Sequence, residues 1–217
     1  MIEFYIGLSS GIKSSLIITL FLMISVSIIG LRVKKMSVVQ TPGTIVLFSI
    51  MFVELVNDMM ADLFKKYWKQ FTPYMLTILL FLIFANTVSM FGLTTPLSNI
   101  SVALGFSLLA FGSIQIAALI IRNPWKRAKD LLEPVPLFLP INLIGEMSTP
   151  FAMGIRLFGN LLSGSIISII IYGITSWFGI IFGAFILHPV FDIFFGIIQA
   201  YVYFMLFSIF LSMAVED

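Results

Sequence analysis

The stretch Pro150-Phe-Ala-Met-Gly-Ile-Arg-Leu-Phe-Gly-Asn160 places an arginine, Arg156, in the middle of an apolar block that runs from residue 137 to 172. This block exceeds the roughly 20 residues that a transmembrane helix needs. An arginine at the centre of such a helix costs about 2.5–3.5 kcal/mol on insertion scales, and its guanidinium does not release its proton to avoid that cost. Arg156 must therefore face protein, water or a carboxylate.

The whole chain has the composition of a membrane protein. Of its 217 residues, 60% are hydrophobic and 10% are charged, whereas soluble domains carry about 25% charge. The sequence has no cysteine and one histidine, which excludes disulfides, thiolate chemistry and a zinc cluster. We therefore expect an all-α protein in a lipid bilayer, without a cofactor, a metal site or a nucleic-acid partner.

Hydropathy divides a single membrane domain into six helical segments. We expect spans at 14–30, 73–91 and 98–121, and then two long, steeply tilted helices at 137–172 and 180–213. The short connection between the long helices predicts an antiparallel hairpin, and Pro150 and Pro189 can bend it. The segment 45–63 carries Glu54, Asp58 and Asp62 on one helical face. This pattern favours an amphipathic helix at the membrane surface over another span.

Lysine and arginine are distributed unequally around the five spans. Ten of the twelve basic residues fall on one side, which the positive-inside rule makes cytoplasmic. They are Arg32, Lys34, Lys35, Lys65, Lys66, Lys69, Arg122, Lys126, Arg127 and Lys129. The N-terminus is then outside and the C-terminus cytoplasmic. The first apolar run, at 14–30, lacks a cleavage site of small residues, and its basic cluster follows it rather than precedes it. We therefore expect an uncleaved helix and not a signal peptide.

Each long helix carries a polar stripe. Steps of three and four residues define the two stripes. The first contains Glu146, Thr149, Met153, Arg156, Asn160 and Ser163, and the second contains His188, Asp192, Gly196, Gln199 and Tyr203. Either stripe alone is also consistent with hydrogen bonds that hold helices together, and Arg156 with an arginine that only stabilises the bundle. Two stripes on facing helices would line a hydrated crevice.

Glu146 and Asp192 are the acids of these two blocks, and each can bind and release a proton. Gln199 does not titrate and is expected to act as a hydrogen-bond partner. His188 fits a structural role at the helix start as well as proton transfer. A fixed cation between two carboxylates would repel a passing cation and attract a carboxylate carried by another protein. We therefore interpret Arg156 as part of an ion path that a partner completes.

The segment Gly154-Ile-Arg-Leu-Phe-Gly-Asn160 resembles the G-L-R-L-F-G-N segment of subunit a of F-type ATP synthases. Similar residues precede it at 71–74, 86, 92–93, 101–102 and 140–146 and follow it at 198–202, and the resemblance extends from about residue 40 to the C-terminus. It implies a non-catalytic stator subunit with two aqueous half-channels for protons or sodium ions. The implied partners are a rotating ring of c subunits, peripheral-stalk b subunits and the rest of the complex, and the implied location is a bacterial plasma membrane.

By this resemblance, Arg156 matches the family's essential arginine, which keeps the half-channels apart and meets the ring's carboxylate. Asn160 and Gln199 match polar positions beside it, and Asp192 matches a position that is often titratable. Glu146 lies near an acidic position, on the side of the cytoplasmic half-channel.

Ser165 departs from the family pattern, because many members carry glutamate or histidine there and a serine cannot relay charge as they do. The alternative to a stator subunit is a stand-alone ion channel or a secondary transporter, which would predict internal repeats or a broken anion-binding helix. An intramembrane enzyme would need a nucleophile with its base or a metal cluster. The sequence contains no H-E-x-x-H. Selectivity between protons and sodium ions depends on the ring, which is another chain.

Overall fold

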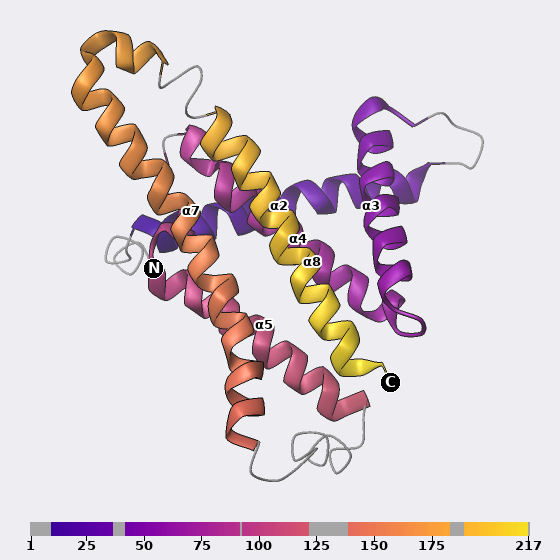
Figure 1. Cartoon of the computed structure of the whole chain (residues 1–217). Helices are drawn as coiled ribbons and strands as arrows, with labels where there is room; N and C mark the ends of the chain where they lie inside the picture. The colour runs from indigo at the N-terminus through magenta and orange to yellow at the C-terminus, as the bar shows by residue number, and fades with distance from the viewer. Residues whose placement is uncertain (1–9, 37–41, 92, 122–138, 183–188, 217) are drawn as a thin grey trace, which may run out of the picture.

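The computed structural model describes residues 10–36, 42–91, 93–121, 139–182 and 189–216, without the side chains of 139–143, 146, 172, 174–182 and 191. The described chain is almost entirely helical (Figure 1). Its elements are α2 (Ser10–Lys35), α3 (Thr44–Leu63), α4 (Trp68–Thr87), η1 (Val88–Phe91), η2 (Pro96–Ser98), α5 (Ile100–Ile121), α7 (Leu139–Phe182), η5 (Pro189–Phe194) and α8 (Phe195–Val215). Six described helices are long and apolar enough to cross a membrane. The expected class, an all-α membrane protein, is confirmed.

The second predicted span begins earlier than expected, at Trp68, so that Pro73 lies inside α4. Pro73 is the sixth residue of α4, and its ring removes one backbone donor of the helix without ending it. The neighbouring threonines bond back to the helix. Thr72 Oγ1 donates to the carbonyl of Trp68 at 2.7 Å and Thr77 Oγ1 to that of Pro73 at 2.8 Å. The proline therefore marks the first turns of the helix and not its boundary.

The expected turn at residues 173–179 is wrong. α7 continues through this stretch as one helix of 44 residues, and the second long helix begins at Pro189 in the π-helical segment η5. No proline occurs between 173 and 179, so every residue there keeps its backbone donor and the helix continues. At 1.5 Å per residue α7 measures about 66 Å along its axis, and Figure 1 shows its last turns bending away from the direction of the rest of the helix. Figure 1 shows α7 and α8 running antiparallel, as the hairpin prediction requires.

α8 is the central helix of the bundle and packs against α3, α4 and α5. Its side chains Tyr203, Phe204 and Phe207 are at most 2% exposed. Gly196 allows α8 to touch α4, because a Cβ on this residue would lie 3.0 Å from the Cβ of Asn86. The Asn86 Nδ2 donates to the Gly196 carbonyl at 3.0 Å. The start of α8 is thus held against the end of α4 by a close contact and a buried hydrogen bond.

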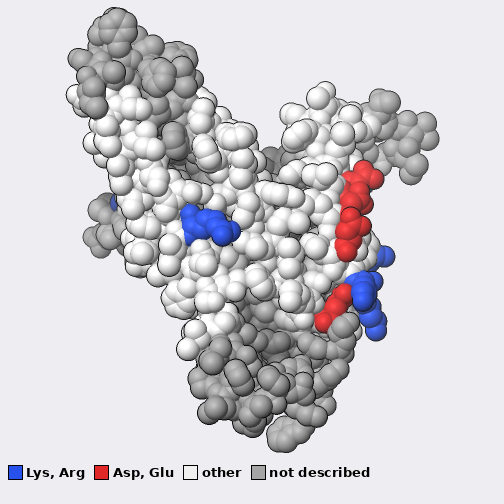
Figure 2. Space-filling model, viewed as in Figure 1, with Lys and Arg blue, Asp and Glu red and all other residues white. Residues whose placement is uncertain are grey.

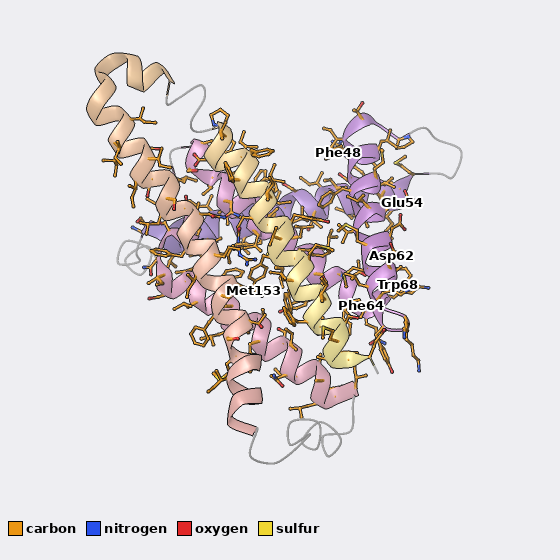
Figure 3. All side chains as sticks on the ribbon, in the orientation of Figure 1. Phe48, Glu54, Asp62, Phe64, Trp68 and Met153 are labelled. Atoms are coloured by element: carbon orange, nitrogen blue, oxygen red, sulfur yellow. The ribbon has the colours of Figure 1, made fainter. Side chains whose placement is uncertain are left out.

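α3 presents its three carboxylates, Glu54, Asp58 and Asp62, on an exposed face. Figure 3 shows Glu54 and Asp62 pointing away from the rest of the bundle. The opposite face buries Val56 and Met60, which are at most 1% exposed. By length and composition α3 is apolar enough to span a membrane, so its placement at the membrane surface stays a prediction.

The end of α8 is attached to the end of α3 and the start of α4 by side chains that recur every four residues. Ser208 Oγ lies 3.5 Å from Met60 Sδ, and Ser212 Oγ donates to the Leu63 carbonyl at 2.7 Å. One turn later Glu216 Oε1 accepts from the backbone N–H of Lys66 at 2.9 Å. Figure 2 shows acidic and basic side chains meeting at this end of the molecule. Since a helix N-terminus favours an anion, the carboxylate stabilises the start of α4.

We expect Glu216→Ala to lower the free energy of unfolding by about 1 kcal/mol at neutral pH, because it removes a charged acceptor from backbone amides. Burial alone would raise the pKa of Glu216, but the amides of Lys65 and Lys66 and the charge of Lys65 hold that pKa below its ordinary value. The carboxylate therefore stabilises the fold above the ordinary pKa and loses this effect as the pH falls through the lowered value.

Thermal unfolding of the detergent-solubilised protein over a pH series measures this contribution. The difference between wild type and Glu216→Ala should vanish at acid pH, and Glu216→Gln, which keeps an acceptor oxygen, should lie between them. Asp62→Ala, on the exposed face of α3, is the matched control. A difference that does not change with pH would contradict the role of the charge.

Candidate functional site

Arg156 projects from the middle of α7 and is exposed. It is the one basic residue in the sequences of α7 and α8. Figure 2 shows an isolated basic patch on the face that these helices form, surrounded by uncharged surface. No carboxylate pairs with Arg156 among the described residues. The guanidinium is therefore presented outward, toward whatever covers this face, and does not neutralise an acid within the described bundle.

The two polar stripes meet one turn beyond Arg156. The Asn160 Nδ2 donates to the Gln199 Oε1 at 2.7 Å and bridges α7 and α8. Gln199 is 5% exposed, whereas Asn160 lies on the exposed face. The amide pair fixes α7 against α8 close to the arginine. The sequence prediction that Gln199 acts as a hydrogen-bond partner agrees with this geometry.

We expect a coupling free energy of about 0.6 kcal/mol between Asn160 and Gln199, the average for hydrogen bonds between transmembrane helices. A double-mutant cycle of Asn160→Ala and Gln199→Ala, followed by unfolding of the purified protein in detergent, measures it. The pair Ser163→Ala and Gln199→Ala serves as the control, because no hydrogen bond joins those side chains in the described structure. Strictly additive effects of the first pair would contradict the bridge.

Other members of the predicted stripes lie apart from this bridge. Tyr203 is 2% exposed and its hydroxyl donates to the Phe106 carbonyl at 2.9 Å, which ties α8 to α5. Ser165 is exposed, and its hydroxyl donates to the Leu162 carbonyl of its own helix at 2.8 Å. Asp192 is half-buried in η5, near the start of the second long helix. Only part of the second stripe therefore reaches α7.

Two predicted residues fall outside what the structure describes. Glu146 has its backbone place near the start of α7 without a described side chain, and His188 lies in the undescribed segment 183–188. Glu146 precedes Arg156 by ten residues, or about 15 Å along the helix. Asp192 precedes Gln199 by seven residues, or about 10 Å. Because α7 and α8 are antiparallel, Glu146 and Asp192 lie toward opposite ends of this helix pair (Figure 1).

A cavity of about 320 Å³ opens beside the N-terminal part of α7. Its walls come from α5, from α7 between Gly145 and Met153, and from the last turns of α8. The polar side chains in its lining are Gln115 and Thr149. Figure 3 shows Met153 on α7, next to α8. This volume is large enough to hold water.

Sequence reasoning missed Gln115, although a signal was present. It is a lone amide in an otherwise apolar helix, and polar residues within membrane helices commonly face the bundle interior or a water-filled cavity. Asn86 is a similar case, since its amide contacts the start of α8. In both cases the pattern of one helix does not indicate which neighbour the amide faces.

The fold and the site define a class: an all-α membrane protein that exposes one guanidinium at mid-helix on an otherwise uncharged face, beside a cavity with polar side chains in its wall. The chain matches the ATP synthase A chain family over residues 14–212, and it belongs to that family.

Several relatives carry the name ATP synthase subunit a. One from Propionigenium modestum, described as sodium ion specific, is 30% identical over 74% of this chain and 60% of its own length. One from Nitrosospira multiformis is 28% identical over 69% of this chain and 58% of its own. One from Legionella pneumophila is 26% identical over 94% of this chain and 87% of its own. The chain thus spans about three-fifths of the first two relatives.

Proposed function

We propose that this chain is the stator subunit of the membrane sector of an ATP synthase. It provides two aqueous half-channels that pass protons or sodium ions to and from carboxylates on a rotating ring of c subunits, and it couples ion flow to ATP synthesis. The chain itself is a non-catalytic, ion-translocating component. The observation that carries this proposal is the exposed guanidinium of Arg156 on an uncharged face of a chain from the ATP synthase A chain family.

A guanidinium exposed at mid-helix in a bilayer needs an anionic or hydrated partner, because lipid alone does not solvate it. A carboxylate carried past this face by another subunit satisfies that need in turn. A guanidinium is a fixed positive charge. In this mechanism it attracts the arriving carboxylate and helps it release its ion, and it repels any cation that would pass directly between the half-channels.

The two half-channels follow from the offset of Glu146 and Asp192 along the antiparallel helices. The cavity beside α7 lies at the Glu146 end of the helix pair and is lined by Gln115 and Thr149. We assign it to the cytoplasmic half-channel. Asp192, near the start of α8, belongs to the half-channel that opens on the other side. An ion then crosses the membrane only by way of the ring.

The proposed orientation places the N-terminus outside and the C-terminus in the cytoplasm of a bacterium, with the protein in the plasma membrane. Lys65, Lys66 and Lys69 support it, because they lie beside the end of α8 at the predicted cytoplasmic face. In the same orientation α3 lies at the membrane surface with its three carboxylates on the exposed face. Peripheral-stalk b subunits complete the proposed set of partners.

ATP synthesis by the purified complex in proteoliposomes tests the proposal. We expect synthesis when either a proton gradient or a sodium gradient is imposed, and comparison of the two identifies the ion. A tagged chain should co-purify with a small hairpin protein that carries a membrane-embedded carboxylate. Ion flux by the chain alone, with no such partner, would favour a stand-alone channel instead.

A further inference from the structure

α7 comes into close contact with α5 at Gly154, two residues before Arg156. A methyl group on this residue would overlap Ser107 Oγ, and it would lie 3.1 Å from the carbonyl oxygen of Ala103 and 3.2 Å from the Cδ2 of Leu104. All three neighbours belong to α5, and one of them, the Ala103 oxygen, is a backbone atom that cannot rotate away. By contrast, Gly159 on the same helix has no such neighbour within 4 Å. An added methyl group would therefore meet α5 at Gly154 and not at Gly159.

The opposing surface of α5 is built from small buried residues. Ala103, Ser107 and Ala110 are at most 2% exposed and follow one face of the helix. The hydroxyl of Ser107 donates to the Ala103 carbonyl at 3.2 Å, so its polar group is satisfied within α5. Small residues allow two membrane helices to approach until their backbones touch. The separation of the two helices at this point is therefore limited by the side chains of α7 and not by those of α5.

This contact controls how far Arg156 projects. Two residues correspond to about 200° around a helix, so Arg156 points away from the side on which Gly154 meets α5. Gly154 is buried and Arg156 is exposed, in agreement with this geometry. Met153 and Leu157 are at most 3% exposed, and their burial fixes the orientation of α7 about its own axis. Any increase in the separation of α5 and α7 therefore displaces the guanidinium outward.

We propose that Gly154 and Ser107 are positioning residues for Arg156: their contact sets the distance between the guanidinium and the carboxylate of the passing ring. This inference rests on the proposed function, because it is the ring that makes the position of the guanidinium matter. An added methyl group at 154 moves α7 outward or rotates it. Displacements of about 1 Å at a reacting group are sufficient to lower rates by up to about a hundredfold.

The test uses the complete complex in membranes and compares coupling per assembled complex. We expect Gly154→Ala to lower coupled ATP synthesis and ions pumped per ATP hydrolysed about tenfold, at unchanged abundance of the complex. Ser107→Gly removes the overlapping hydroxyl, so Gly154→Ala with Ser107→Gly should recover at least half of the loss. Gly105→Ala on α5 and Gly173→Ala on α7 are matched controls, because neither glycine has a neighbour within 4 Å of an added Cβ.

The outcomes separate the inference from its alternatives. A lower abundance with unchanged coupling per complex would assign Gly154 a purely structural role, and unchanged coupling or failure of Ser107→Gly to rescue would overturn the contact. If the complex with Gly154→Ala does not assemble, Ser107→Thr replaces it, because it adds a methyl group to the same contact from α5. We expect the same loss of coupling from this variant. Arg156→Ala measured in parallel separates the two proposals: if it too leaves coupling intact, the proposed function itself fails.

Discussion

Arg156→Ala is expected to lower ion-coupled ATP synthesis by more than about a hundredfold while the complex still assembles. The loss is large because the guanidinium is the one fixed cation on the face of α7 and α8, and electrostatic stabilisation in a water-poor site is commonly worth several kcal/mol. Assembly should survive, because Arg156 is exposed and forms no ion pair among the described residues. Removing it leaves no buried charge unpaired within that part of the chain.

Arg156→Lys should also be severely impaired, although it keeps a positive charge. An ammonium is a strongly hydrated point charge that can release its proton when desolvated, whereas a guanidinium keeps its charge and presents a planar set of donors. ATP synthesis by membrane vesicles under an imposed gradient measures both variants, with assembly followed by co-purification. Arg32→Ala, at the end of α2, is the matched control for loss of a basic residue. Wild-type synthesis by Arg156→Ala would refute the stator assignment.

The sequence predicts the membrane class and the existence of most helices because both depend on local composition. The segments at 45–63 and 98–121 agree with α3 and α5 almost to the residue. The predicted helix ends are wrong where the sequence has no strong helix-terminating residue. The Gly173-to-Gly179 stretch has low helix propensity but contains no proline, and α7 continues through it. A proline is informative only by its position, since Pro73 and Pro150 lie within helices.

The candidate site is likewise only partly predictable from the sequence. Arg156 stands out in the sequence because one charge in an apolar block is costly, and a stripe of steps of three and four identifies Asn160. The partner of each polar group is set by packing between helices, which no single stripe encodes. Gln199 and Tyr203 share a stripe, yet one bonds to α7 and the other to α5. The close approach at Gly154 is likewise invisible until Ser107, about 50 residues earlier in the sequence, is placed opposite it.

Asp192→Asn is expected to slow passive ion flux through the membrane sector about a hundredfold, the lower end of what a positioned proton-transfer group contributes. The asparagine keeps the size and hydrogen-bonding capacity of the side chain but cannot carry a proton or a charge. Asp192 is half-buried at the start of the second long helix, about 10 Å along the helix from Gln199. In the proposed mechanism Asp192 delivers ions to the ring, a step distinct from the exchange at Arg156.

Passive flux through membranes stripped of the soluble catalytic sector isolates this step, because no ATP chemistry then limits the rate. Glu54→Gln and Asp62→Asn remove carboxylates from the exposed face of α3 and should leave the flux unchanged. Asp192→Glu, which restores a titratable group, should recover most of the flux. Undiminished flux in Asp192→Asn would remove this residue from the path. An equal loss in Asp192→Glu would indicate that the site requires the aspartate's size rather than its charge.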